Sequence, residues 1–420
     1  MKRITRYAVV LSLSLVSLGL LGFLVRGSML PAPSSGTWAP TPGVLAEARS
    51  GAAAAMLSDG RVLVTGGDGA AGAALSSAEV FSLDGAFTPV APMSFARSKH
   101  VAVALKDGRV LVAGGVGIDG SASNSAEIYD PSSNVWQAAG AMLEARSGAT
   151  ATLLSDGRVL VAGGASGSVV SPTLEVFDPV SDSFVPGGVM SSPRQDHAAA
   201  RLADDRILLI GGSTGDAVLG SSELWDSASG QIVAGPAMSV PRQGLSATTL
   251  IDGTVLLAGG NDGTNDLAVT EIFDPAAGTV VAGASLLSSA RRDHLAVLLP
   301  HNASVLMVGG TALGVPVAGA ELYIPWSGGS NPTGSPAAAR ALAVASPTGT
   351  DGLLLLAGGK DAAGATLNSG EVYGFATVKT DKDDYVPGDQ VLISGAGWEP
   401  NDTVNLTLPL RLPVVQMVAA

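Results

Sequence analysis

Short apolar runs separated by glycine-rich turns make up most of the chain. In one stretch, the small apolar run 149–154 is followed by an Asp-Gly pair and then by the continuous apolar run 158–162. Asp-Gly is a preferred hairpin turn because glycine accepts positive φ, and an unbroken apolar run indicates a strand buried on both faces. Gly163-Gly164 ends this strand, a third strand carries Glu175, and a fourth contains Phe184. The pattern predicts a four-stranded antiparallel unit.

Seven copies of this unit follow one another at a nearly constant interval. Each copy has a Gly-Gly pair, with an Arg before it and a Glu after it at almost fixed distances. The pairs begin at Gly66, Gly114, Gly163, Gly211, Gly259, Gly309 and Gly358. The charged markers are Arg49, Arg97, Arg146, Arg194, Arg242, Arg292 and Arg340, with Glu79, Glu127, Glu175, Glu223, Glu271, Glu321 and Glu371. Residues that recur in every copy are best explained by a role in the structure of the unit. We therefore predict that the Arg and Glu markers form structural ion pairs.

These markers resemble the kelch repeat, which has a Gly-Gly pair, a Glu-apolar-Tyr strand and a Trp strand at a period of about 50 residues. The resemblance covers residues 37–375. It implies an all-β fold, a seven-bladed propeller like the central domain of galactose oxidase. The first strands are rich in Ala, as at 51–55, and this suits the crowded centre of a ring.

The two ends of the repeat region complement each other. The seventh unit stops after Tyr373 without an aromatic fourth strand. At the other end, Trp38 precedes Arg49 at nearly the same spacing that separates Trp136 from Arg146 in an interior unit. We therefore predict that an N-terminal strand completes the seventh blade, which removes the open edges of the array.

Residues 1–26 have the pattern of an export signal. Lys2, Arg3 and Arg6 precede the uncharged run 8–25. As a helix this run would measure about 27 Å, close to the thickness of a bilayer core, so a cleaved signal peptide and an uncleaved anchor both remain open. Either one predicts an exported protein, at the cell surface, outside the cell or in the periplasm, that touches membrane only through an uncleaved segment. Residues 27–36 are the expected linker.

The composition changes after residue 375. Residues 376–420 resemble the opening of bacterial immunoglobulin-like modules, with a turn at 385–388, a strand at 391–394 and a Gly-Trp-Glu-Pro stretch from Gly397. A complete sandwich of this kind needs about 100 residues. We therefore expect an incomplete immunoglobulin-like segment at the end of a bacterial exported protein.

Overall composition narrows the chemistry. The 420 residues are 46% hydrophobic and 14% charged, with a net charge of −13 and no Cys. The apolar content excludes a disordered chain, and the negative charge argues against nucleic acid as a partner. The resemblance implies, for galactose oxidase, a copper site built on a Cys cross-linked to Tyr, which a chain without Cys cannot form. We expect no cofactor and no metal.

The candidate binding residues lie on one face of the predicted ring. In a propeller, the connections from second to third strand and from each blade to the next emerge together, and here they carry all the variable loops. The candidates are His100, His197, His294, Asp119, Asn124, Asp216, Asn261, Asp262, Asn265, Asp266 and Asp361. The three His come from different blades, so convergence on a metal is not expected, and the other interpretation is a packing and hydrogen-bonding role at a position where kelch repeats often have a His. The acidic loop 261–266 lacks the spacing of an EF-hand.

Two functions of different classes fit these observations. The first is an extracellular or surface-attached binding or scaffold protein that recognises a glycan or a protein through the variable loops. The alternative is an extracellular carbohydrate-active enzyme, for example one similar to the kelch-type bacterial sialic acid mutarotases, with its site at the centre of the ring. The chain has no G-x-S-x-G, H-E-x-x-H or P-loop motif in a usable context, which favours binding over catalysis.

Overall fold

The computed structural model describes residues 29–30, 32–381 and 392–397. The predicted export signal therefore lies outside the described residues, as does most of the predicted immunoglobulin-like segment. The described residues form strands, turns and loops without a helix. No helix long and apolar enough to cross a membrane occurs in this part of the chain.

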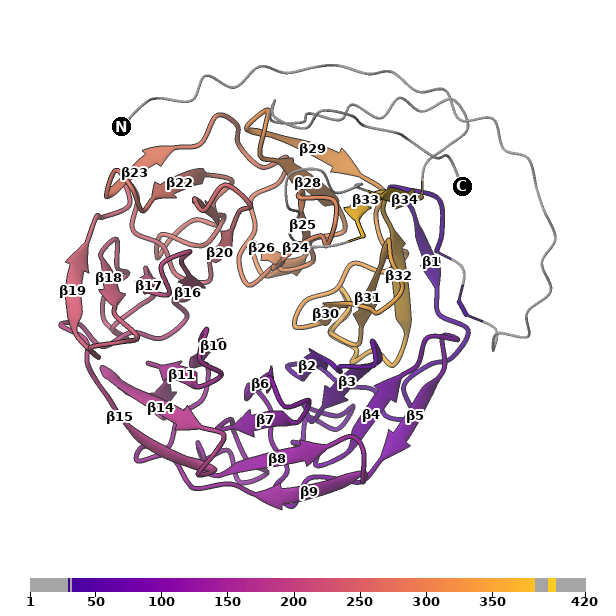
Figure 1. The fold of residues 1–420 in the computed structure, drawn as a ribbon, viewed down its shortest axis with the longest axis horizontal. Helices are drawn as coiled ribbons and strands as arrows, with labels where there is room; N and C mark the ends of the chain where they lie inside the picture. The colour runs from indigo at the N-terminus through magenta and orange to yellow at the C-terminus, as the bar shows by residue number, and fades with distance from the viewer. Residues whose placement is uncertain (1–28, 31, 382–391, 398–420) are drawn as a thin grey trace.

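Seven four-stranded antiparallel sheets are arranged radially around one axis, as Figure 1 shows. Blade one consists of β2 (Ala53–Met56), β3 (Val62–Thr65), β4 (Ala78–Phe81) and β5 (Phe87–Val90). Blade two consists of β6 (Val101–Ala104), β7 (Val110–Ala113), β8 (Ala126–Asp130) and β9 (Val135–Ala138). Blade three consists of β10 (Thr150–Leu153), β11 (Val159–Ala162), β14 (Thr173–Asp178) and β15 (Ser183–Val189).

Blades four to six follow the same order from the axis outward. Blade four consists of β16 (Ala198–Arg201), β17 (Ile207–Ile210), β18 (Ser222–Trp225) and β19 (Ile232–Gly235). Blade five consists of β20 (Ser246–Thr249), β21 (Val255–Ala258), β22 (Thr270–Asp274) and β23 (Thr279–Ala282). Blade six consists of β24 (Leu295–Leu298), β25 (Val305–Val308), β28 (Ala320–Ile324) and β29 (Gly329–Thr333). Short hairpins, β12 (Ala165–Ser166) with β13 (Val169–Val170) and β26 (Thr311–Ala312) with β27 (Val315–Pro316), project from blades three and six.

Blade seven combines the two ends of the propeller. It consists of β30 (Val344–Pro347), β31 (Leu353–Ala357), β32 (Gly370–Gly374) and the N-terminal strand β1 (Trp38–Pro40). β1 pairs with β32 antiparallel, with Trp38 opposite Tyr373. The predicted seven-bladed, strand-closed propeller is confirmed.

Burial follows the predicted pattern. The second strand of every blade is buried along its whole length, which explains its unbroken apolar sequence. Toward the rim, third-strand and fourth-strand aromatic rings pack with centroids 5.0 Å apart in blades one, two, three and seven. In blades four and five, Trp225 and Phe273 face the smaller Ile232 and Val280 in the same positions.

After the propeller the chain forms one more hairpin among the described residues. β33 (Thr377–Thr380) pairs with β34 (Ile393–Ala396). This hairpin follows the end of β32, on the face that carries the turns between first and second strands. We call this side the turn face and the opposite side, with the variable connections, the loop face.

Candidate functional site

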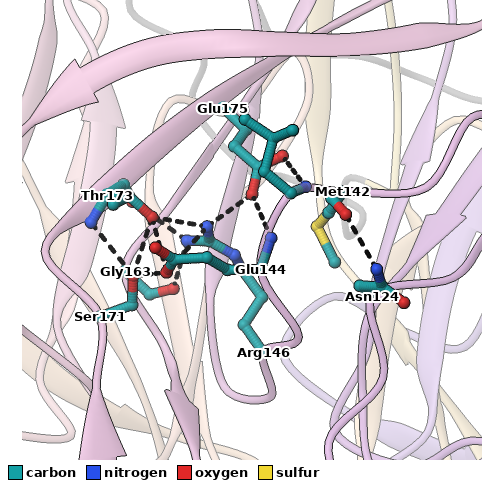
Figure 2. Close-up of polar contacts among 9 residues, drawn as sticks. Asn124, Met142, Glu144, Arg146, Gly163, Ser171, Thr173 and Glu175 are labelled. Carbon is teal, nitrogen blue, oxygen red and sulfur yellow. Dashed lines mark hydrogen bonds and ion pairs between the residues drawn. The ribbon is translucent and has the colours of Figure 1, made fainter.

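A buried Arg–Glu clamp fixes the entrance to each blade, and Figure 2 shows the clamp of blade three. The Arg146 guanidinium donates to the carbonyls of Gly163 and Thr173, at 2.8 and 3.0 Å, and to Glu175 Oε1 at 2.6 Å. The other Glu175 oxygen accepts the Leu143 N–H at 2.7 Å. The clamp therefore ties the segment that enters the blade to the second and third strands.

The same arrangement recurs around the ring. In all seven blades the Glu carboxylate also accepts a backbone N–H from the incoming segment, at 2.7–2.9 Å. At six of the seven blade junctions the Arg carbonyl accepts the N–H of the preceding blade's second glycine, at 2.8–3.0 Å. The charges of these pairs are thus used in construction, as predicted for structural ion pairs, although the Nε atom of each clamp Arg is buried without a hydrogen-bond partner.

One predicted clamp residue is wrong. Arg291, not Arg292, is the buried partner of Glu321, at 3.1 Å and with 0% of its side chain exposed. Arg292 is 37% exposed and points to Asp266 at 3.4 Å. The turn after β24 contains one extra residue, since Leu299 N–H bonds to Ser304 five residues on, whereas Leu57 N–H bonds to Arg61 four residues on. Because of this insertion, the clamp Arg of blade six lies one residue farther before its Gly-Gly pair, which begins at Gly309, than in blades one to five.

The three candidate histidines lie between blades and not on the loop face. The Nε2 atoms of His100, His197 and His294 are 2.8–2.9 Å from hydroxyl groups of the preceding blade, those of Thr65, Thr150 and Ser246. All three side chains are buried. Burial, together with the neighbouring Arg, lowers each His pKa to about 3, so the rings are neutral at physiological pH. Their placement corrects the prediction that they form part of a binding surface.

The acidic loop of blade five is held by its own side chains. Asp266 accepts hydrogen bonds from Asn261 Nδ2 at 2.8 Å and from the Leu313 N–H of blade six at 2.6 Å. Asp262 caps a turn by accepting the N–H groups of Thr264 and Asn265, at 2.8 and 2.7 Å. These carboxylates therefore shape the loop and join it to the next blade.

The remaining candidates are spread around the loop face. Asp119 accepts the Ser121 N–H at 3.0 Å, and Asp361 accepts the N–H groups of Ala363 and Ala365 at 2.9 Å. Asn124 donates to the Met142 carbonyl at 3.0 Å, the contact drawn in Figure 2. Asp216 is exposed at the tip of its loop. The structure does not bring the predicted set together.

A different set of residues converges on the axis. Two residues before each innermost strand, the chain adopts left-handed φ values of 51–62°. These seven positions, the axial ring, are Gly51, Lys99, Gly148, Asp196, Gly244, Asp293 and Leu342. Five backbone hydrogen bonds of 2.8–3.1 Å link ring residues of successive blades, such as Lys99 N–H to the Gly51 carbonyl. The backbone is therefore nearly the same at each position, and only the side chains differ.

Charged groups of opposite sign from alternate blades interact across the axial ring. Burial raises the pKa of Asp196, and burial together with the charge of Asp196 raises the pKa of Asp293. Lys99 and Arg292 act against both shifts. The Asp293 side chain is still 48% exposed, so solvent and solutes reach it. A Cβ on Gly244 would lie 2.5 Å from the Asp293 carboxylate, so that glycine leaves room for the acid.

The axial ring was missed in the sequence, although a signal for it exists. The residue two after each clamp Arg is Gly, Lys, Gly, Asp, Gly, Asp and Leu in successive copies. The charge of this residue varies from copy to copy, whereas the neighbouring Arg, Gly-Gly and Glu markers recur in every copy. The variable loops carry more conspicuous carboxylates, but these stabilise their own loops and, at Asp266, the contact with the next blade.

Comparison with known proteins identifies the repeat. Residues 97–143 match the Kelch motif. This segment runs from the clamp Arg of blade two to the entrance of blade three, so it is one of the seven copies. No curated protein matches the chain.

Two solved structures share the kelch propeller architecture. A structure titled "Structure of YjhT" matches with a TM-score of 0.51 and 18% identity, over 64% of this chain and 93% of that one. A fungal alcohol oxidase of the AA5 family, solved in complex with copper, matches with a TM-score of 0.64 and 14% identity, over 87% of this chain and 84% of that one. At these identities the matches establish the fold.

A galactose-oxidase-type copper site does not fit this chain. The thioether-linked Tyr requires a Cys, and the sequence has none. Within the described ranges, no group of three His, Asp or Glu side chains is arranged to hold a metal ion.

Proposed function

We propose that the chain is an exported binding protein that recognises a glycan or a protein segment on the loop face, centred on the axial ring. The observation that carries this proposal is the ring itself. Seven positions with a common backbone hold Lys99, Asp196, Asp293 and Leu342 beside three glycines. Their charges differ from blade to blade while the clamps around them do not, and solvent-exposed variation on a rigid scaffold is typical of a recognition surface.

The places at which the chain enters and leaves the propeller also favour the loop face as the binding surface. The N-terminal segment enters β1 at the turn face, where Gly36 N–H bonds to the Gly374 carbonyl at 2.8 Å. The chain also leaves blade seven at this face, through β33. A signal anchor before residue 27 and further modules after residue 397 would both extend from the turn face. The loop face then remains accessible to a ligand.

The binding proposal is tested with a glycan array and a peptide library, probed with the purified full-length chain. Asp196→Asn/Asp293→Asn should lower the affinity for any hit at least tenfold, because both carboxylates are removed without changing side-chain size. Asp216→Asn is the matched control on the same face, away from the axis. Binding that is lost in Asp216→Asn and kept in the double variant would move the site to the outer loops and refute the axial ring.

A second candidate function is an extracellular carbohydrate-active enzyme. It is favoured by the exposed Asp196 and Asp293 side chains on the axial ring, whose pKa values burial raises, because a raised carboxyl pKa is the direction of shift that a general acid needs. Incubating each array hit with the protein and analysing the sugar by NMR separates the two functions. Turnover that disappears in Asp293→Asn would establish the enzyme, and a hit recovered unchanged supports binding.

A further inference from the structure

Residues 375–380 cross three separately formed parts of the propeller, and we call them the clasp segment. Phe375 N–H bonds to the Gly352 carbonyl in the first turn of blade seven, at 2.9 Å. Ala376 N–H bonds to Ser35 Oγ, in the segment before β1, at 3.1 Å. Asn302 Nδ2 donates to the Ala376 carbonyl at 2.6 Å, and Val378 N–H bonds to the His301 carbonyl at 2.8 Å, both in the first turn of blade six.

The turns that receive the clasp segment differ from the other five. In blades one to five the turn closes from residue i to i+4, whereas in blades six and seven it closes from i to i+5. The extra residue in blade six comes with left-handed φ at His301 and Ala303. Asp351, in the longer turn of blade seven, contacts His301 Nδ1 at 3.3 Å and forms an ion pair with Lys379. Both insertions therefore lie where the clasp segment contacts the ring.

The junction that the clasp segment spans lacks the bonds that join other blades. Two backbone contacts recur between neighbouring blades, one from the second glycine to the clamp Arg carbonyl and one along the axial ring. Among the described residues, only the junction of blades six and seven has neither, since no such bond joins Gly310 to Arg340 or Leu342 to Asp293. This junction, which we call the seam, therefore lacks both recurring contacts, and the Gly334 N–H still bonds to the Gly36 carbonyl at the rim at 2.9 Å.

We propose that the longer turns of blades six and seven are a docking surface for the chain that follows the propeller, and that the clasp segment locks this seam. The occupant is the protein's own residues 375–380, and Thr377 is buried in the contact. The lock is separate from the closure made by β1, which joins β32 within blade seven. It also fixes the direction in which the β33–β34 hairpin leaves the turn face.

Asn302→Asp tests the lock from the propeller side. The new side chain keeps the acceptor for the Ser304 N–H, a bond of 3.2 Å in the native turn, but it loses the donor to Ala376 and places a carboxylate against that carbonyl. Asn134→Asp is the matched control, because Asn134 lies in a turn of the same face and its side chain accepts from Tyr129 and Ala91. Val378→Pro removes the other hydrogen bond from the tail side.

The measurement uses two nitroxide labels on the full-length chain, which has no Cys of its own. Labels at Ile251→Cys, exposed on the turn of blade five, and at Ser394→Cys, exposed on β34, report the position of the hairpin relative to the ring. We expect a narrow distance distribution in the parent and in Asn134→Asp, and a broad one in Asn302→Asp and Val378→Pro. The thermal midpoint should fall by about 2–4 °C in both test variants, the loss expected for one hydrogen bond. A narrow distribution with an unchanged midpoint in either test variant would overturn the proposal.

Discussion

Trp38 packs against Tyr373, with ring centroids 5.0 Å apart, although the two residues stand at opposite ends of the propeller sequence. The Trp38 indole also donates to the Gly334 carbonyl at 2.7 Å, in the segment that leads from blade six to blade seven. The Trp38 side chain thus joins β1 both to β32 and to the segment between blades six and seven. β1 must meet these two parts of the chain for the ring to close.

Trp38→Ala should destabilise the whole propeller, because it empties the rim of blade seven and breaks the indole hydrogen bond. We expect a loss of about 3 kcal/mol in the free energy of unfolding, within the range for large aromatic deletions. Trp326→Ala is the control, since Trp326 is 71% exposed, and it should change stability by less than about 0.5 kcal/mol. Chemical denaturation followed by far-ultraviolet circular dichroism measures both, and equal losses would argue against strand closure as a major source of stability.

Adjacent arginines in blade six should respond very differently to the same substitution. Arg291→Ala leaves the buried Glu321 carboxylate without its cation, which costs roughly 3–5 kcal/mol. Arg292→Ala removes a partly exposed contact to Asp266 and should cost below about 1 kcal/mol. Urea unfolding of the two variants gives the comparison directly. A larger loss for Arg292→Ala than for Arg291→Ala would mean that Arg292, and not Arg291, is the clamp residue of blade six.

The buried histidines predict a loss of stability in mild acid. Their pKa is about 3 in the folded protein and near 6.5 in the unfolded chain, so the unfolded state takes up more protons between these values. Stability should be unaffected above pH 6.5 and fall as the pH drops toward 3, by up to about 1.4 kcal/mol per pH unit for each His. The His100→Gln/His197→Gln/His294→Gln variant should show a shallower decline over this window. A triple variant that follows the parent profile would show that other groups govern acid unfolding.

Neutralising the axial carboxylates should stabilise the fold. A carboxyl group whose pKa is raised on folding is ionised at a cost at neutral pH, and this cost disappears when the pH falls through the raised pKa. Asp293→Asn should therefore raise the melting temperature at pH 7 and have less effect near pH 4. Differential scanning calorimetry at both pH values checks the sign. A lower melting temperature at pH 7 would show that Asp293 contributes to folding, contrary to a role in recognition.

The repeated parts of this protein are predictable because each copy confirms the others. Blade number, strand order and the closing role of Trp38 all follow from spacing, since local turn chemistry and burial impose the same pattern seven times. The one misassigned clamp, at Arg292, arose where an extra turn residue broke that spacing. The Arg-x-x-His pattern shared by Arg97, Arg194 and Arg291 preserves the correct register and is independent of the turn length.

The axial ring is not predictable in the same way. Lys99, Asp196 and Asp293 belong to alternate blades and lie far apart in the sequence, and only closure of the sheets brings them around one axis. The pKa of each of the two carboxyl groups is raised by lost hydration, and that of Asp293 also by the charge of Asp196, and both effects are properties of the assembled ring. The carboxylates of the loops were easier to notice, but their hydrogen bonds serve local turns.

The seven positions of the axial ring share one left-handed backbone conformation and differ only in their side chains. Lys, Asp and Leu already occupy the conformation beside glycine, and none of them disturbs a clamp or a strand. Single-codon changes at these sites alter the chemistry presented at the centre while every sheet stays in register. Selection for a new ligand can therefore act on these positions without any change to the frame that holds them, and it acts on Gly244 and Asp293 together, since a side chain at 244 would meet the Asp293 carboxylate.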